Sequence, residues 1–198
     1  MAMKVNRKLI KFGKGVTILF VGDKDCGKTC VITRYINDMY FEEKMEHEES
    51  RLKDYQMNGE NVEVRLVEFR QCEYNEEETL SIFRKANALI CCFPSNEGMK
   101  AMQQWMNYVD RFITSDKLWF ICQTKTDLGC MDIPIEDRKT FTFQHTFTKY
   151  FEVSSKTGEN IQNALNEVID ITVKKFVNFE PKPSQPEPAP RREICTVV

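Results

Sequence analysis

Eight residues near the start of the chain have the composition and spacing of a phosphate-binding loop. The segment Gly22-Asp23-Lys24-Asp25-Cys26-Gly27-Lys28-Thr29 fits the pattern G-x-x-x-x-G-K-[ST] at every position. In such a loop, backbone N–H groups and the N-terminus of the following helix surround an anionic phosphate. Lys28 is then expected to reach the outer phosphates, and the Thr29 hydroxyl to ligate Mg²⁺. The residues predicted to contact phosphate are Asp25, Cys26, Gly27, Lys28, Thr29 and Cys30.

The elements that position this loop form an alternating pattern of apolar runs and amphipathic helices. Such alternation predicts an α/β fold, with a parallel sheet between two layers of helices. The dipeptide Asn58-Gly59 predicts a hairpin, which makes one edge strand antiparallel. The predicted strands cover residues 16–21, 52–57, 62–69, 88–93, 118–123 and 150–153. The predicted helices cover residues 30–37, 79–87, 97–114, 135–148 and 160–177. The expectation is a six-stranded, mostly parallel sheet with about five helices on both faces, the P-loop NTPase fold.

Composition excludes several other classes of protein. The chain has 28 Lys and Arg residues against 30 Asp and Glu, a net charge of -2, which argues against nucleic-acid binding through bulk charge. No apolar run reaches about 18 residues, and the start lacks the patterns of a secretory signal and of myristoylation. The eight cysteines are therefore expected to be reduced thiols in a cytosolic protein, and with two histidines their spacing does not favour a zinc site.

A second set of motifs bears on which nucleotide the phosphate loop binds. Thr124-Lys125-Thr126-Asp127 directly follows the predicted strand 118–123, and Glu152-Val153-Ser154-Ser155-Lys156 follows the last predicted strand. With the phosphate loop, these segments resemble the motifs of a Ras-superfamily small GTPase, [N/T]-K-x-D and E-T-S-A-K. The resemblance covers about residues 14–178 and implies binding of GTP or GDP with Mg²⁺.

The resemblance assigns a role to each of these residues. Asp127 would accept hydrogen bonds from the guanine ring N–H and exocyclic amine, a donor pair that adenine lacks. Lys125 would lie along the base, and Tyr40 occupies the position of an aromatic residue that stacks on it. The guanine-binding residues implied are Tyr40, Thr124, Lys125, Asp127, Ser154, Ser155 and Lys156. The segment 82–88, Ile-Phe-Arg-Lys-Ala-Asn-Ala, is similar to a Rab segment, so the Rab family is the closest resemblance.

The residues that would switch the protein and catalyse hydrolysis depart from the family pattern. No Thr lies between Thr33 and Thr79, so the first switch has no Thr to sense Mg²⁺ and the γ-phosphate. Where the Rab pattern reads W-D-T-A-G-Q-E, this chain reads Val67-Glu68-Phe69-Arg70-Gln71-Cys72-Glu73. Glu68 is a longer stand-in for the Asp, whereas Cys72 takes the position of the Gln that orients the attacking water. No catalytic residue is therefore assigned, and weak GTP hydrolysis is expected.

The phosphate loop and first switch also differ in charge from the family. Lys24 and Asp25 stand where small residues or Gly are usual, so Lys24 is expected to crowd the γ-phosphate. Asp25 places a carboxylate near the phosphates, which lowers nucleotide affinity. The first switch carries five acidic residues, Glu42, Glu43, Glu46, Glu48 and Glu49.

The predicted domain limits leave a segment at each end. Residues 1–14 form a basic extension, 15–178 the G domain, and 179–198 a Pro-rich tail that ends Cys195-Thr196-Val197-Val198. That ending fits C-a-a-X, which predicts prenylation of Cys195 and reversible attachment to the cytosolic face of a membrane. Neither the farnesyl nor the geranylgeranyl group is favoured by Val198.

These patterns leave more than one function open. The leading interpretation is a Rab-like GTP-binding protein in membrane traffic, with effector and regulator proteins on its switch surface. The alternative is a non-enzymatic scaffold of the same fold that binds partners independently of nucleotide. A P-loop nucleotide kinase or ATPase would need a lid with converging arginines, and no arginine cluster is visible.

Overall fold

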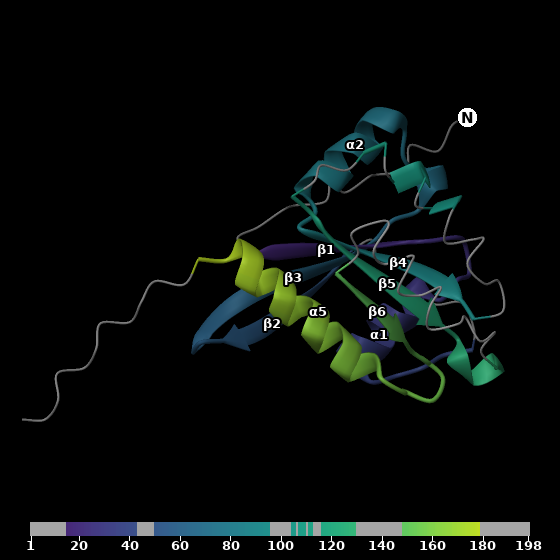
Figure 1. Cartoon of the computed structure of the whole chain (residues 1–198). Coiled ribbons are helices and arrows are strands. Elements are labelled where there is room, and N and C mark those ends of the chain that lie inside the picture. The colour runs from purple at the N-terminus through teal and green to yellow at the C-terminus, as the bar shows by residue number, and fades with distance from the viewer. Residues whose placement is uncertain are drawn as a thin grey trace, which may run out of the picture.

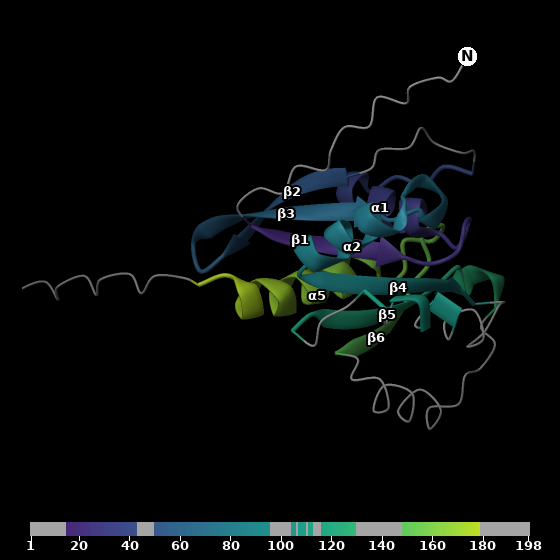
Figure 2. The ribbon, with the colours of Figure 1, turned by 90° about the horizontal axis from the view of Figure 1, so that it is seen from above.

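The computed structural model describes residues 15–42, 50–95, 104–105, 107–109, 111–112, 116–129 and 148–178. A six-stranded sheet with the order β2-β3-β1-β4-β5-β6 crosses the molecule (Figures 1 and 2). Only β2 and β3 pair antiparallel among these strands, and the other pairs are parallel. The strands are β1 Val16–Val21, β2 Ser50–Met57, β3 Glu60–Glu68, β4 Ala88–Pro94, β5 Leu118–Thr124 and β6 Lys149–Glu152. The expected fold class is confirmed.

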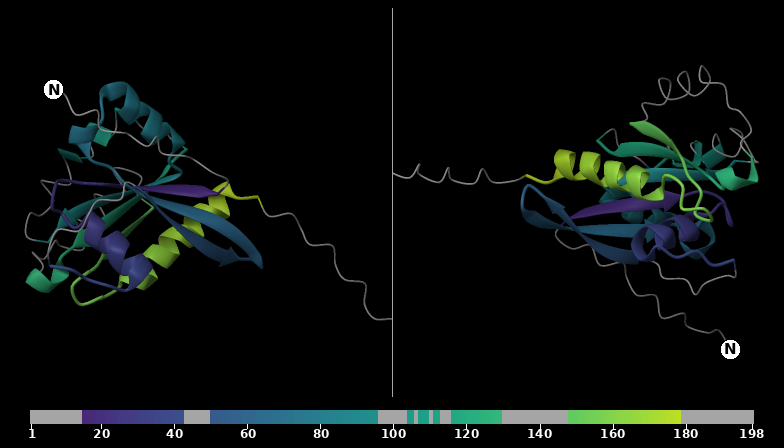
Figure 3. Two further views of the ribbon diagram at one scale, coloured as in Figure 1. Left: turned by 180° about the vertical axis from the view of Figure 1, so that it is seen from behind. Right: turned by 90° about the horizontal axis from the view of Figure 1, so that it is seen from below.

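Helices cover both faces of this sheet (Figure 3). α1 (Lys28–Asn37) and α5 (Ile161–Phe176) lie on one face, and α2 (Glu76–Lys85) lies on the other. Two short 3₁₀ turns, η1 (Gln71–Glu73) and η2 (Thr126–Leu128), follow β3 and β5. Within the described ranges, no helix is both long and apolar enough to cross a membrane.

The central strand β1 is buried on both faces because its side chains alternate between two cores. Ile18 and Phe20 pack with α1 and α5, whereas Leu19 and Val21 pack with α2. A strand covered on both sides requires a continuous apolar run, which is the pattern of Val16–Val21. The second core also contains Trp105, from the segment after β4.

The structure differs from the predicted helix bounds in ways that local chemistry explains. α2 begins at Glu76 rather than at residue 79, because Asn75 and Glu78 form a capping box. The helix ends at Lys85, because Asn87 pairs with β1: its side-chain oxygen accepts from Thr17 N–H at 2.8 Å. α1 begins at Lys28, two residues earlier than expected. Of the helix predicted over 97–114, residues 104, 105 and 107–109 are helical as predicted, and most of the rest lies outside the described residues. The helix predicted over 135–148 lies outside them except for residue 148, which is a bend.

The topology brings the candidate functional residues to one edge. The carboxyl ends of the parallel strands β1, β3, β4, β5 and β6 meet there, and β1 lies between β3 and β4. The segment that follows β1 leads to β2 on one side of the sheet, whereas the segment that follows β4 leads to β5 on the other side. Open α/β sheets bind ligands at the point between two such strands.

Candidate nucleotide-binding site

The phosphate loop turns sharply from β1 into α1, and its two glycines allow that turn. Gly22 has φ +146°, and a Cβ there would lie 2.3 Å from the backbone oxygen of Cys92. Gly27 has φ +101° and accepts the first helical hydrogen bond, from Val31 N–H at 2.9 Å. Both positions therefore require Gly. The turn points the N-terminus of α1 into the loop, as phosphate binding needs.

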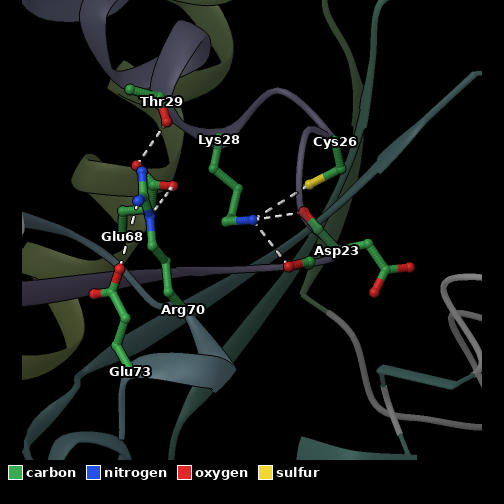
Figure 4. Close-up of polar contacts among 8 residues, drawn as sticks. Asp23, Cys26, Lys28, Thr29, Glu68, Arg70 and Glu73 are labelled. Carbon is green, nitrogen blue, oxygen red and sulfur yellow. Dashed lines mark hydrogen bonds and ion pairs between the residues drawn. The ribbon is translucent and has the colours of Figure 1, made fainter. Parts of the chain in front are cut away.

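Lys28 folds back over the loop (Figure 4). Its Nζ donates to the backbone oxygens of Gly22 at 2.9 Å and Asp23 at 2.7 Å, and lies 3.7 Å from Cys26 Sγ. Lys28 is 4% exposed, so the ammonium is held inside the loop. A cation held there contacts phosphate oxygens by exchanging one of these three hydrogen bonds for a bond to the ligand.

Cys26 is a buried cysteine of the phosphate loop, and its thiol is uncharged. Burial raises the pKa of its thiol to about 12, and the neighbouring Cys92 adds to that rise. Lys28 acts in the opposite direction but does not overcome burial. The thiol is therefore protonated at neutral pH and places no negative charge beside the phosphate position.

A chain of polar contacts joins the end of the phosphate loop to the end of β3 (Figure 4). The Thr29 hydroxyl donates to Glu68 Oε2 at 2.7 Å, across 39 residues of sequence. The other oxygen of Glu68 accepts from Arg70 Nε at 3.2 Å, and Arg70 also contacts Glu73 Oε1 at 3.4 Å. The buried Glu68 carboxylate thus has a hydroxyl on one side and a guanidinium on the other.

The base end of the site is built by β5 and the loop after β6. Ser154 Oγ donates to Asp127 Oδ1 at 2.6 Å, which orients the carboxylate expected to read guanine. Lys125 adopts a left-handed backbone, φ +58°, and its Nζ donates to the Asp25 carbonyl at 2.7 Å. Thr124 Oγ1 donates to the Cys26 carbonyl at 2.5 Å. These bonds place the base-end segment directly against the phosphate loop.

The remaining residues of the predicted guanine site lie around this core. Ser155 is buried, whereas Lys156 is exposed and its Nζ lies 3.9 Å from Glu42 Oε1. Glu42 comes two residues after Tyr40, so the ion pair brings that segment beside the base-end loop. Tyr40 itself is half-buried, and Lys24 and Asp25 are exposed in the phosphate loop.

Two contacts of the site were not predicted from the sequence. Trp105 Nε1 donates to the Asp23 carboxylate at 2.6 Å, and Arg70 contacts Glu68. The sequence indicated that position 70 is unusual, because Arg70 stands where the second-switch pattern has Ala. The pairing of Trp105 with Asp23 had none, because 82 residues separate them. The Cys72 side chain lies outside what the structure describes.

The fold and this loop define a P-loop nucleotide-binding domain, and comparison with known proteins gives its family. A model of the Ras family matches residues 17–174, so the chain belongs to the Ras family, as a Rab-like small GTPase. Members of this family bind guanine nucleotides and typically Mg²⁺.

Individual relatives are distant but similar over most of their length. The chain is 25% identical to the Ras-related protein Rab-18 of Caenorhabditis briggsae over 158 residues, which is 77% of this chain and 78% of the relative. It is 20% identical to the GTP-binding protein YPTM2 of Zea mays over 176 residues, 87% and 86% of the two chains. It is 23% identical to the Ras-related protein RABD2a of Arabidopsis thaliana, over 74% of each chain.

Proposed function

We propose that this protein binds GTP and GDP in the site described, hydrolyses GTP weakly and acts in membrane traffic. The observation that carries the proposal is the bond from Lys125 to the Asp25 carbonyl. It joins the segment suited to recognise guanine to the loop suited to hold phosphates. The Asp127 carboxylate, held by Ser154, then faces a ligand whose other end lies at Lys28.

Recognition of guanine follows from the chemistry of Asp127. A carboxylate accepts two hydrogen bonds from the ring N–H and the amine of guanine, and adenine does not present that donor pair. An adenine nucleotide would leave the carboxylate without these two hydrogen bonds, which is a strong basis for discrimination. Lys125 lies along the base, and Tyr40, Ser155 and Lys156 complete the base end.

The groups that would hold Mg²⁺ are Thr29 and Glu68. The Thr29 hydroxyl and the Glu68 carboxylate lie 2.7 Å apart, and both are oxygen ligands of the kind that Mg²⁺ binds, so these residues fit the ion. Bound there, the ion would neutralise charge on the phosphates.

Weak hydrolysis follows from groups that the sequence lacks. Neither a Thr in the first switch nor the Gly of the second switch is present to bind the γ-phosphate. Cys72, at the usual Gln position, has no amide to orient a water. Each such loss raises the barrier by several kcal/mol, about 3 for one well-placed donor.

Membrane attachment in this proposal depends on Cys195, in the tail beyond the described residues. One prenyl group beside Arg191-Arg192 would give reversible binding to the cytosolic face of a membrane. The Pro-rich segment would act as an extended spacer between the lipid and the domain.

The first experiment identifies the nucleotide. Purified protein is denatured and the released nucleotides are separated by chromatography, with GTP or GDP expected. Asp127→Ala should weaken guanine-nucleotide binding by about tenfold or more, through loss of two charge-assisted hydrogen bonds. Asp116→Ala is the matched control, because Asp116 is exposed at the opposite end of β5. Recovery of no nucleotide, together with no effect of Asp127→Ala, would contradict the proposal.

The second experiment measures hydrolysis in a single turnover of bound GTP. We expect a rate below about 10⁻⁴ s⁻¹, slower than the intrinsic rate of an intact family member. A faster rate would show that another group orients the water.

A scaffold function is the second candidate, favoured by the Thr29–Glu68–Arg70–Glu73 contacts. These side-chain contacts tie the second-switch segment to the start of α1. A partner that binds equally to wild-type protein and Lys28→Ala would support this candidate. Loss of partner binding in Lys28→Ala would favour a nucleotide-dependent switch.

A further inference from the structure

Arg70 places a permanent positive charge beside the groups suited to hold a metal ion. Its Nε lies 3.2 Å from Glu68 Oε1, while Glu68 Oε2 accepts from the Thr29 hydroxyl at 2.7 Å. One carboxylate therefore separates the guanidinium from the hydroxyl at the start of α1 (Figure 4). The Glu68 side chain is 7% exposed, so its charge needs a nearby partner.

The backbone on both sides of Arg70 is fixed, so its position is a built feature of the fold. Phe69 N–H donates to the Phe20 carbonyl at 2.9 Å, and the Phe69 ring packs edge-on against Phe83 at 5.0 Å. On the other side, Glu73 N–H donates to the Arg70 carbonyl at 3.0 Å.

Guanidinium and Mg²⁺ compete for the same carboxylate. Two cations within a few ångströms repel, and the repulsion is strongest where water is partly excluded. Arg70 also contacts Glu73, so the same guanidinium offsets two carboxylates at the end of β3. A metal ion added here would gain less from Glu68 than it would if that carboxylate were not already paired.

We propose that Arg70 is a built-in competitor of Mg²⁺ for the Glu68 carboxylate, so that bound nucleotide is retained with little dependence on Mg²⁺. The proposal rests on nucleotide binding as proposed above. A guanidinium stays charged at every working pH and pairs well with a carboxylate. Arg70 keeps the Glu68 carboxylate paired whether or not a metal ion is present, so removal of the metal changes this part of the site little.

The test measures release of N-methylanthraniloyl-GDP into excess unlabelled GDP, with Mg²⁺ or with EDTA. For wild-type protein we expect the two release rates to agree within about twofold. For Arg70→Ala, which restores the small residue of the family pattern, EDTA should speed release by about tenfold or more. Arg70→Lys keeps the charge and should remain insensitive to EDTA.

Arg84→Ala is the matched control, because Arg84 is exposed on α2, next to the opposite end of the sheet. It removes the same charge and should behave as wild type. If EDTA speeds wild-type release by about tenfold, or speeds it equally in wild type and Arg70→Ala, the proposal is overturned. The wild-type ratio alone decides the matter if Arg70→Ala does not fold. Failure of wild-type protein to bind the labelled GDP would instead overturn the proposed function.

Discussion

The indole of Trp105 donates a hydrogen bond to the Asp23 carboxylate at 2.6 Å. Trp105 comes from the segment after β4 and is 7% exposed, while Asp23 lies in the phosphate loop. The same indole packs edge-on against Phe69 at 6.5 Å, at the end of β3. One side chain therefore links the phosphate loop to the beginning of the second-switch segment.

This contact predicts measurable coupling between Trp105 and Asp23. Trp105→Phe keeps an aromatic ring but removes the N–H, and Asp23→Asn removes the acceptor charge. A hydrogen bond to a charged group contributes about 1.5–3 kcal/mol, and the exposure of Asp23 favours the lower end. Denaturant unfolding of both single variants and the double variant should give a coupling free energy of about 1.5 kcal/mol. Strictly additive effects would show that the bond does not contribute to stability.

Ser154→Ala should weaken guanine-nucleotide binding without unfolding the protein. The variant removes the bond that orients the Asp127 carboxylate, so the carboxylate must pay a larger ordering cost when it binds guanine. We expect the Kd for GDP to rise about tenfold, measured by isothermal titration calorimetry. Ser81→Ala, on the exposed face of α2, is the control and should leave the Kd unchanged. An unchanged Kd in Ser154→Ala would indicate that other groups hold Asp127.

Cys26 should resist alkylation in the native protein. With a pKa of about 12, only about one thiol in 10⁴ is ionised at pH 8, and the thiolate is the reactive form. At pH values below the pKa, its reactivity should rise about tenfold for each unit that the pH increases, because the fraction of thiolate rises tenfold. Iodoacetamide labelling followed by peptide mass spectrometry should find Cys26 modified only after denaturation. Rapid labelling of native protein at pH 8 would contradict this assignment.

Asn75→Ala should lower thermal stability through loss of the α2 cap. Asn75 Oδ1 accepts from Glu78 N–H at 2.8 Å, and Asn75 N–H donates to Glu78 Oε2 at 3.0 Å. Loss of an N-cap costs about 1 kcal/mol, which lowers Tm by about 2–4 °C in a domain of this size. Glu77→Ala, an exposed substitution in the same turn, should change Tm by less. Equal Tm values for Asn75→Ala and wild type would contradict the role of the cap.

The elements most completely predicted from the sequence are those governed by local patterning. β1 matches its predicted bounds because a strand buried on both faces needs an uninterrupted apolar run. The hairpin also follows from local chemistry: Asn58 and Gly59 have φ +53° and +74°, the left-handed values that this dipeptide tolerates. The start of α2 was predicted too late because apolar periodicity does not detect a polar cap.

The sequence by itself determined the phosphate loop, the motif around Asp127 and the absence of the switch Thr and Gly. Each is a short pattern whose chemistry depends on neighbours along the chain. Only the tertiary structure decided which groups meet across the site. The parallel pairing of β1 with β3 places Glu68 opposite Phe20, and so beside the loop that carries Thr29. The same register places Arg70 next to Glu68 and Thr29. Short sequence patterns do not predict this, because the pairing of distant strands is set by the packing of the whole sheet.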